Sequence, residues 1–363
     1  MIYRLLAKSY TRTIVAALVA LVFAIAVTSI VLSVSGFDPP STFQAMFEFG
    51  KEPDSVVNTV NRASGYYLSA LAVAVGFRMN LFNIGVDGQY RLAAMLAAAV
   101  GGAWALPAGL HQLVIVLVAV AVGGLWAAIP AMLKVARGVS EVISTIMLNF
   151  IATAIIGFLL QPGRLAVQLG PNNIGTKQIS SSGRMPGIPY PGSELKLYSF
   201  LVIAILAGIG YWFMINRTRF GFDLRATGLS QSAAVASGVD AKRMVVMAMV
   251  MSGAMAGLIG MPQLLGGSYT YSLDFPAGIG LTGIGIALLG RNGPVGIAFA
   301  ALLWAFLDQS SQILDFNDIP KEIVAITQAA VLLSVVIVYE VVNRAGRRID
   351  QRRVATQLGE VTA

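Results

Sequence analysis

The sequence contains no cysteine, only one histidine, and few charged residues. None of its 363 residues is Cys, His111 is the single imidazole, and charged residues make up 12%. The absence of cysteine excludes disulfides and thiolate metal sites. One histidine cannot supply a histidine-based catalytic triad or a zinc cluster. We therefore expect no catalytic residues, no metal site and no cofactor bound by this chain.

The scarcity of charge also fixes the class of protein. Hydrophobic residues make up 56% of the sequence. A soluble domain would carry about twice the observed charged fraction. The 38 glycines suit close packing of helices in lipid. The composition therefore predicts an all-α polytopic membrane protein with one membrane domain.

Long apolar segments divide the chain into about ten expected transmembrane helices. The first is too long for a signal peptide and is expected to be retained. The expected spans are Thr13–Val34, Val56–Phe77, Ile84–Leu106, Gln112–Leu133, Val139–Leu160, Leu197–Ile215, Met244–Leu265, Pro276–Gly290, Pro294–Asp308 and Ile323–Val342.

The net charge of +8 is distributed as an orientation signal. With both termini cytoplasmic, most of the 25 Lys and Arg residues fall on the inner side. The outer side holds only Lys51, Arg62, Arg164, Lys177, Arg184, Lys196 and Lys321. Cytoplasmic loops carry such an excess of positive residues in membrane proteins. The basic balance therefore indicates topology and no nucleic-acid partner.

The membrane domain is expected to cover residues 1–343, followed by a basic cytoplasmic tail at 344–363. Two outer loops, 35–55 and 161–196, interrupt it. The second loop is rich in Gly, Pro, Asn and Ser and predicts irregular structure. Each loop is either a solvated connector or a docking surface for an external delivery protein. The stretch GPNNIGTKQ lacks the Gly-Lys pair of a phosphate loop, so ATP is not expected to bind there.

A polar, basic segment at 217–243 interrupts the apolar pattern on the predicted inner side. Ser230 can cap a short helix through Gln231–Ser237, and Gly238 can end it. Asp240 can then cap the next apolar run. A short helix on the inner side, between two spans, is an element that a soluble motor protein can bind in order to drive a membrane protein.

Polar side chains also occur at the break between the second and third expected spans, in NLFNIGVDGQYR. Asp87 and Arg91 are four residues apart and are expected to pair on one helix face. Such residues must face protein, water or ligand in a membrane. The segment is either a hydrogen-bonded helix start or part of a gate or substrate path. Asn149, inside the fifth expected span, is expected to face a cavity.

Four motifs, in order, resemble the permease subunits of bacterial ABC importers. They are NLFNIGVDGQ, EVISTIMLNFIA, FGFDLRATGLSQSAAVASGVD and GLTGIGIALLGRNGPVGIAFAALLW. The resemblance covers about residues 60–340. It lies within the branched-chain amino acid and ribose permease superfamily, and FNIGVDGQ and EVISTIMLNF most resemble the nucleoside permeases. The family often has Glu where Asp87 stands.

The resemblance implies a type II ABC importer-like fold in a bacterial inner membrane. It also implies a second homologous permease, a cytoplasmic ATP-binding cassette ATPase that binds ATP and Mg²⁺, and an extracellular or periplasmic substrate-binding lipoprotein. The stretch 228–238 corresponds to the coupling helix that contacts the ATPase. The matching positions are Gly228, Ser230, Ala233, Ala234 and Gly238.

Transport by alternating access follows from the same resemblance, with nucleosides as the expected cargo. Ribose hydroxyls need polar partners and the base needs an apolar or aromatic surface. The expected polar contacts are Asn83, Asp87, Gln89 and Asn149, and the expected base contacts are Phe82 and Phe150. Two alternatives remain open, namely the same machine carrying ribose, another sugar or branched-chain amino acids, and an ion-coupled secondary transporter. The latter needs ionisable groups in mid-span, but Asp87, Glu141 and Asp308 lie near span ends.

Overall fold

The structure is a computed structural model that describes residues 9–171, 173–316, 319–320 and 322–334, with Ile337 and Arg344. It consists of two compact units. One unit holds residues 1–51 and 307–363, and the other holds residues 52–306. Each unit is described by itself.

The first unit contains a sharply bent pair of helices. Helix α2 (Ser9–Val34) is followed by α3 (Pro39–Gly50) after a bend of 115°. Gly36 provides the left-handed backbone at the bend, with φ of +85°. Asp38 caps α3 by accepting a hydrogen bond from the Ser41 N–H.

Helix α3 corrects the expectation that residues 35–55 form only a connecting loop. Its Met46 is buried with Leu32 and Leu314 in the core of this unit. Helix α15 (Gln312–Phe316) supplies Leu314, and an apolar helix at Glu322–Ser334 follows. Residues 35–55 therefore include a packed amphipathic helix.

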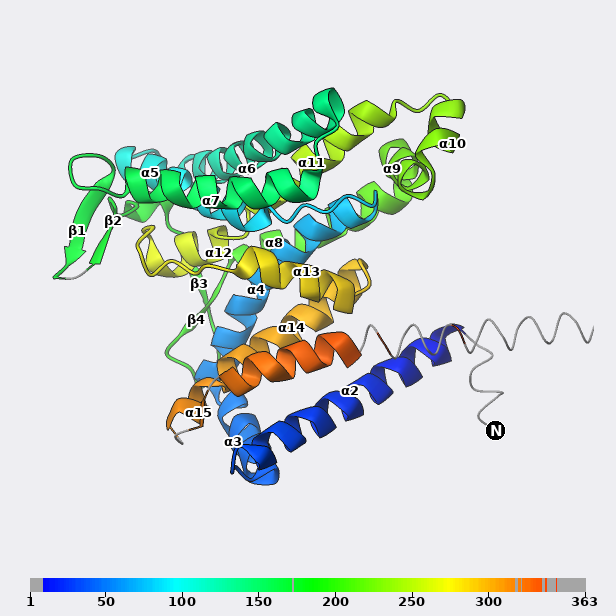
Figure 1. The fold of residues 1–363 in the computed structure, drawn as a ribbon. Helices are drawn as coiled ribbons and strands as arrows, with labels where there is room; N and C mark the ends of the chain where they lie inside the picture. Colours follow the sequence, from blue (N-terminus) through cyan, green and yellow to red (C-terminus); the bar gives the residue numbers. More distant parts are fainter. Residues whose placement is uncertain are drawn as a thin grey trace, which may run out of the picture. The chain divides into compact units, whose positions relative to one another are not determined.

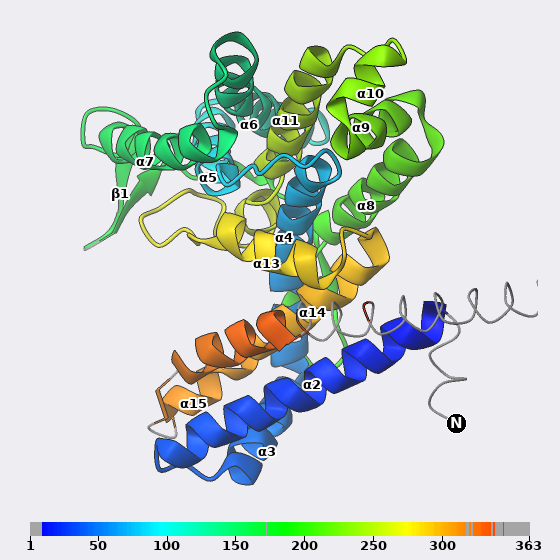
Figure 2. The same ribbon diagram turned by 45° about the vertical axis from the view of Figure 1, so that its right-hand side comes forward.

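The second unit is a bundle in which a helix overlaps each predicted apolar segment from the second to the ninth (Figures 1 and 2). Helix α14 ends at Ser310, in the first unit. The long helices are α4 (Pro53–Phe77), α5 (Val86–Ala103), α6 (Leu110–Arg137), α7 (Glu141–Leu159), α8 (Phe200–Arg217), α11 (Ala241–Gly257), α13 (Ile279–Leu289) and α14 (Pro294–Ser310).

Glycine allows the closest helix crossing in this bundle, between α6 and α11. A Cβ built on Gly123 would lie 2.2 Å from the carbonyl oxygen of Gly253, and one on Gly257 would lie 2.1 Å from that of Ala119. No side chain fits at such separations, so the two backbones touch. Small residues at helix interfaces are typical of packing in lipid.

Helix α11 ends in an irregular turn. It continues through α12 (Met261–Gln263) into a π-helical turn, η2 (Leu264–Ser268). Tyr269 ends the turn in the left-handed region with φ of +55°, which is uncommon for a residue with a side chain. The following segment bonds to the second outer loop, because the Thr176 N–H donates to the Tyr271 carbonyl at 2.8 Å.

The second outer loop contains two small antiparallel sheets, so the expectation of irregular structure at 161–196 is wrong. Strands β1 (Ala166–Gly170) and β2 (Asn173–Thr176) pair, as do β3 (Gly187–Pro189) and β4 (Lys196–Tyr198). Between them, the 3-10 turn η1 (Ser181–Gly183) packs on the buried His111. One ring nitrogen of His111 donates to the Gly101 carbonyl at 3.1 Å, and the other accepts from the Ser182 hydroxyl at 3.0 Å.

By length and hydropathy, five described helices can cross a membrane, or six if the bent pair α2–α3 is one span. The five are Leu110–Arg137, Glu141–Leu159, Phe200–Arg217, Ala241–Ser268 and Pro294–Phe316. The count of ten spans and the positions of the termini stay predictions. The tail from 345 onward lies outside the described residues.

Candidate coupling and substrate-path site

The basic segment between α8 and α11 folds into two capped helices. Thr218 caps α9 (Arg219–Leu229) by accepting from the Gly221 N–H at 3.1 Å. Ser230 then caps α10 (Gln231–Ala236) through the Ala233 N–H. Gly238, with φ of +87°, ends the turn, and Asp240 caps α11. The predicted helix at 231–237 and its caps are confirmed, whereas the sequence analysis missed α9.

The five predicted coupling residues are divided between the surface and the interior. Ser230, Ala233 and Gly238 are exposed on or beside α10, whereas Ala234 is buried. Gly228 packs inside the chain, since a Cβ there would lie 2.7 Å from the Arg78 carbonyl oxygen. Only part of the predicted set is therefore available to a partner protein.

Large apolar side chains that the sequence analysis missed complete the exposed surface of α9 and α10. Leu229 is 89% exposed and Val235 is 56% exposed. Phe222 on α9 is also exposed. Helical spacing was the available signal, because the buried Leu224 marks the inner face of α9 and leaves Phe222 on the outer face. These exposed apolar side chains in a basic segment are candidates for contact with a partner protein.

A hydrogen bond joins α9 to the polar break between α4 and α5. The amide of Asn80 donates to the Gly228 carbonyl at 3.3 Å. Asn80 adopts the left-handed conformation with φ of +55°, which asparagine tolerates better than most residues. The break is thus held against the helix that leads into α10.

The buried side-chain amides of Asn83 and Gln89 form a hydrogen-bond network a few residues after Asn80 in the sequence. Asn83 and Gln89 form a reciprocal pair, with N–H···O distances of 2.9 and 3.0 Å. Asn83 also donates to the Ser252 hydroxyl of α11 at 2.9 Å, and Ser252 donates to the Ala72 carbonyl of α4 at 2.7 Å. The network therefore ties α4, α5 and α11 together.

Asn149 of α7 bonds to backbone at the start of α5. Its carbonyl oxygen accepts from the Gly88 N–H at 2.8 Å, and its amide donates to the Ile84 carbonyl at 2.9 Å. Gly88 is required for this approach, since a Cβ there would lie 2.8 Å from the Asn149 oxygen. Asn149 thus satisfies backbone groups that a helix N-terminus leaves open.

Asp87 and Arg91 form the predicted pair on α5, with 4.0 Å between oxygen and nitrogen. Asp87 also accepts a 3.2 Å hydrogen bond from the Gly280 N–H of α13. Arg91 donates to the Thr153 hydroxyl of α7 at 3.2 Å. This charged pair is mostly buried and links three helices.

The two predicted aromatic contacts lie at the surface of the chain. Phe82 is 49% exposed and packs edge-on against Phe77, with ring centroids 5.2 Å apart. Phe150 on α7 is 68% exposed. The structure thus brings together Asn83, Asp87, Gln89 and Asn149 around the start of α5, whereas Phe82 and Phe150 are exposed apolar side chains that bond to none of them.

Figures 1 and 2 show α9 and α10 at one end of the second unit and the β1–β2 hairpin at the other. Helices of membrane-spanning length run between these ends. Such a bundle, with glycine-packed helices, a polar break inside it and a capped two-helix segment at one end, is the architecture of a membrane permease.

Residues 55–338 match the family described as the branched-chain amino acid transport system permease component. The chain belongs to this family and is a transport subunit of the cell membrane. No solved structure matches the chain.

Several relatives are named as ABC transporter permeases. The chain is 34% identical to the guanosine permease NupP of Bacillus subtilis, over 89% of this chain and 93% of NupP. It is 30% identical to the nucleoside permease NupB of Lactococcus lactis, over 96% and 98% of the two chains. It is 29% identical to the glucose permease TsgB13 of Haloferax volcanii, over 85% and 83%.

Proposed function

We propose that this chain is the membrane-spanning subunit of an ATP-driven nucleoside importer. The observation that carries the proposal is the full-length similarity to guanosine and nucleoside permeases. The chain forms the pathway, while ATP and Mg²⁺ are bound by a partner ATPase. A second homologous permease completes the pathway, and a substrate-binding lipoprotein delivers the cargo outside.

In this proposal, about ten spans place both termini in the cytoplasm. The opposite locations of the α9–α10 segment and the β1–β2 hairpin support an inner and an outer end of the bundle. The excess of basic residues on the predicted inner side supports the same orientation.

The partner ATPase docks on α9 and α10 through Leu229, Val235 and the exposed small residues around Ser230. Apolar side chains that fill a groove on the partner protein supply much of the binding energy of such interfaces. Movement of α10 is passed to the polar break through α9. The contacts that transmit it are the hydrogen bond from the Asn80 amide to the Gly228 carbonyl and the packing of Gly228 against Arg78. Alternating access then follows from displacement of α5, α7 and α11 as a linked set.

The proposed substrate path runs past the start of α5. Phe82 and Phe150 offer aromatic surface for a base, and Asp87 is a mostly buried charge at the start of α5. Asn83, Gln89 and Asn149 are hydrogen bonded within the chain, so they contact ribose only after the network opens. If Asn83→Ala and Asn149→Ala variants insert normally and leave uptake kinetics unchanged, these two residues are not substrate contacts.

Uptake measurements in cells that lack other nucleoside transporters test the cargo. Labelled uridine and adenosine are supplied to cells with and without the chain, with unlabelled ribose, glucose and leucine as competitors. We expect uptake to be lost on deletion and to be insensitive to all three competitors. Normal nucleoside uptake without the chain contradicts the nucleoside assignment.

A sugar importer is the second candidate, because the glucose permease of Haloferax volcanii aligns over most of its length. Competition by glucose or ribose, together with loss of labelled sugar uptake on deletion, selects this candidate. Branched-chain amino acid cargo gives the corresponding result with leucine.

A further inference from the structure

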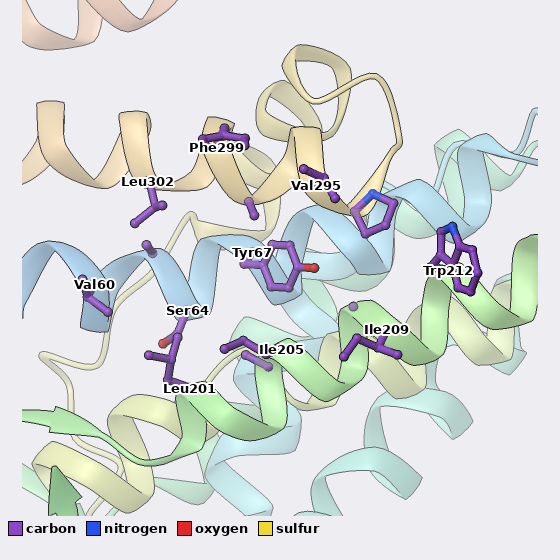
Figure 3. Close-up of a pocket in the computed structure, with 15 residues that line it drawn as sticks. Val60, Ser64, Tyr67, Leu201, Ile205, Ile209, Trp212, Val295, Phe299 and Leu302 are labelled. Atoms are coloured by element: carbon purple, nitrogen blue, oxygen red, sulfur yellow. The ribbon is translucent and has the colours of Figure 1, made fainter.

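An apolar groove lies on the second unit, and none of its lining residues belongs to the polar break. It has a volume of about 770 Å³ and runs between α4, α8 and α14 (Figure 3). Its lining includes Tyr67, Ile205, Trp212, Val295 and Phe299. Ser64 and Tyr67 supply the only side-chain polar groups in its lining apart from the Trp212 ring nitrogen.

Two walls of the groove, α8 and α14, are helices of membrane-spanning length, and the rims of the groove are exposed. Helices α8 and α14 both have the length and hydropathy of spans. Phe299 is 70% exposed, and Ile205 and Val295 are also exposed. Exposed apolar side chains of spans face either hydrocarbon or another membrane subunit, and the charge at one end of this groove favours lipid.

Glycine and tyrosine bring α8 and α4 close together in the groove. A Cβ on Gly208 of α8 would lie 1.8 Å from the Tyr67 hydroxyl of α4. The ring of Tyr67 therefore lies directly over the α8 backbone and fills the space that a side chain at position 208 would need. Figure 3 shows the Tyr67 ring between the two helices, with Trp212 toward one end.

That end of the groove carries positive charge. The Arg217 guanidinium lies 5.5 Å from the centre of the Trp212 ring. Arg291 lies on the turn before Pro294, which lines the groove. The Tyr211 hydroxyl of α8 donates to the Asn292 carbonyl at 2.9 Å and fixes this turn beside α8. Tryptophan and arginine in this arrangement are typical of a membrane interface.

From this arrangement we propose that the groove binds an anionic phospholipid. One acyl chain lies between α4, α8 and α14, along Tyr67 and Ile205. The phosphate lies beyond Trp212 and is held by Arg217 and Arg291. Charge complementarity selects the headgroup, because basic residues near the surface attract anionic lipids. None of the lining residues belongs to α10 or to the polar break, so this site does not depend on the nucleoside assignment.

Brominated lipids test the proposal, because bromine quenches tryptophan fluorescence at short range. A variant that keeps Trp212 and changes Trp104, Trp126 and Trp304 to Phe is reconstituted in phosphatidylcholine vesicles. Brominated phosphatidylglycerol or brominated phosphatidylcholine is then added in increasing proportion. A second variant that keeps only Trp104 reports on bulk lipid.

We expect brominated phosphatidylglycerol to quench Trp212 at a several-fold lower proportion than brominated phosphatidylcholine, and to quench Trp104 without preference. Arg217→Gln reduces the preference about fivefold, from the typical contribution of one basic residue near a surface. The matched control Arg137→Gln, at the end of α6, leaves it unchanged. Equal quenching of Trp212 by both lipids overturns the proposal.

A groove-filling variant separates the acyl-chain site from a general surface effect. Ala298→Phe fills the groove from α14, while Ala121→Phe adds the same ring to an exposed position on α6. Only Ala298→Phe is expected to abolish the preferential quenching of Trp212 by brominated phosphatidylglycerol. Both variant proteins are expected to elute as single species. If Ala298→Phe instead dissociates the assembled permease and leaves the lipid preference intact, a neighbouring helix occupies the groove and the proposal is wrong.

Discussion

At the scale of single residues, the amide network at the start of α5 shows how this permease keeps polar groups inside its bundle. The side-chain oxygen and nitrogen of Asn83 each bond to Gln89, and the nitrogen also donates to Ser252. A buried polar group without a partner is costly in lipid as in a soluble core. The network is therefore a stabilising joint between helices.

A double-mutant cycle on Asn83 and Gln89 measures the interaction energy between these two side chains. Asn83→Ala and Gln89→Ala each leave a buried amide without its partner, so we expect each to lower the free energy of unfolding by about 1–2 kcal/mol. The double variant loses less than the sum, by about 1 kcal/mol. Reversible denaturant unfolding of the purified protein gives the values. Asn216→Ala, at an exposed amide, serves as the control, and strict additivity contradicts a coupled pair.

Gly228 provides the residue-scale test of coupling. Gly228→Val places side-chain atoms against the Arg78 carbonyl and pushes α9 away from the polar break. We expect ATP hydrolysis by the complex to continue while uptake into vesicles falls at least tenfold. Gly210→Val is the matched control, because nothing lies within 4 Å of a Cβ at Gly210. Parallel loss of hydrolysis and uptake would instead indicate failed docking of the ATPase.

Local sequence rules predicted the capped helix α10 because its signals lie within a few residues. The amide network was not predictable, since Asn83 and Ser252 are far apart in sequence and meet only after folding. The same reason explains the missed sheets of the outer loop, where β2 bonds to the segment after η2. Asp38 and Pro39 form a local start signal for helix α3. The helix was nevertheless missed, because the surrounding loop is polar and shorter than a membrane span.

At the scale of helices, contact between backbones sets the position of α6 against α11. Gly257→Val introduces a side chain 2.1 Å from a carbonyl oxygen, which α6 can accommodate only by moving away. We expect the free energy of unfolding to fall by about 1–3 kcal/mol, which is typical of overpacking. This loss is measured as a lower unfolding temperature in detergent. Gly157→Val on α7 meets no neighbouring atom and should leave that temperature unchanged. Equal effects of the two variants would mean that the crossing is loose.

The exposed apolar side chains of α9 and α10 make the docking proposal testable at the same scale. Leu229→Glu with Val235→Glu is expected to reduce co-purification of the partner ATPase more than tenfold, since charges replace apolar anchors. The isolated permease should unfold at the same temperature as the wild type. Val139→Glu, at the exposed turn between α6 and α7, is the control. Retained ATPase in the double variant rules out this surface as the docking site.

At the scale of the whole molecule, the absence of cysteine makes the orientation directly measurable. A single thiol introduced as Glu194→Cys lies in the second outer loop, and Gln231→Cys lies on α10. Both positions are exposed. We expect an impermeant thiol reagent to label the first in intact cells and the second only after the membrane is opened. Labelling of both positions in intact cells contradicts the proposed topology.

The buried His111 also holds the second outer loop at a point between its two small sheets. The loop is fastened to the helices at its midpoint through η1, with β1–β2 on one side of the fastening and β3–β4 on the other. Each half also has a second attachment, because the Thr176 N–H donates to the Tyr271 carbonyl and the Met185 N–H donates to the Leu265 carbonyl. A single cut by a protease within β1 would therefore leave both halves of the loop attached to the helices.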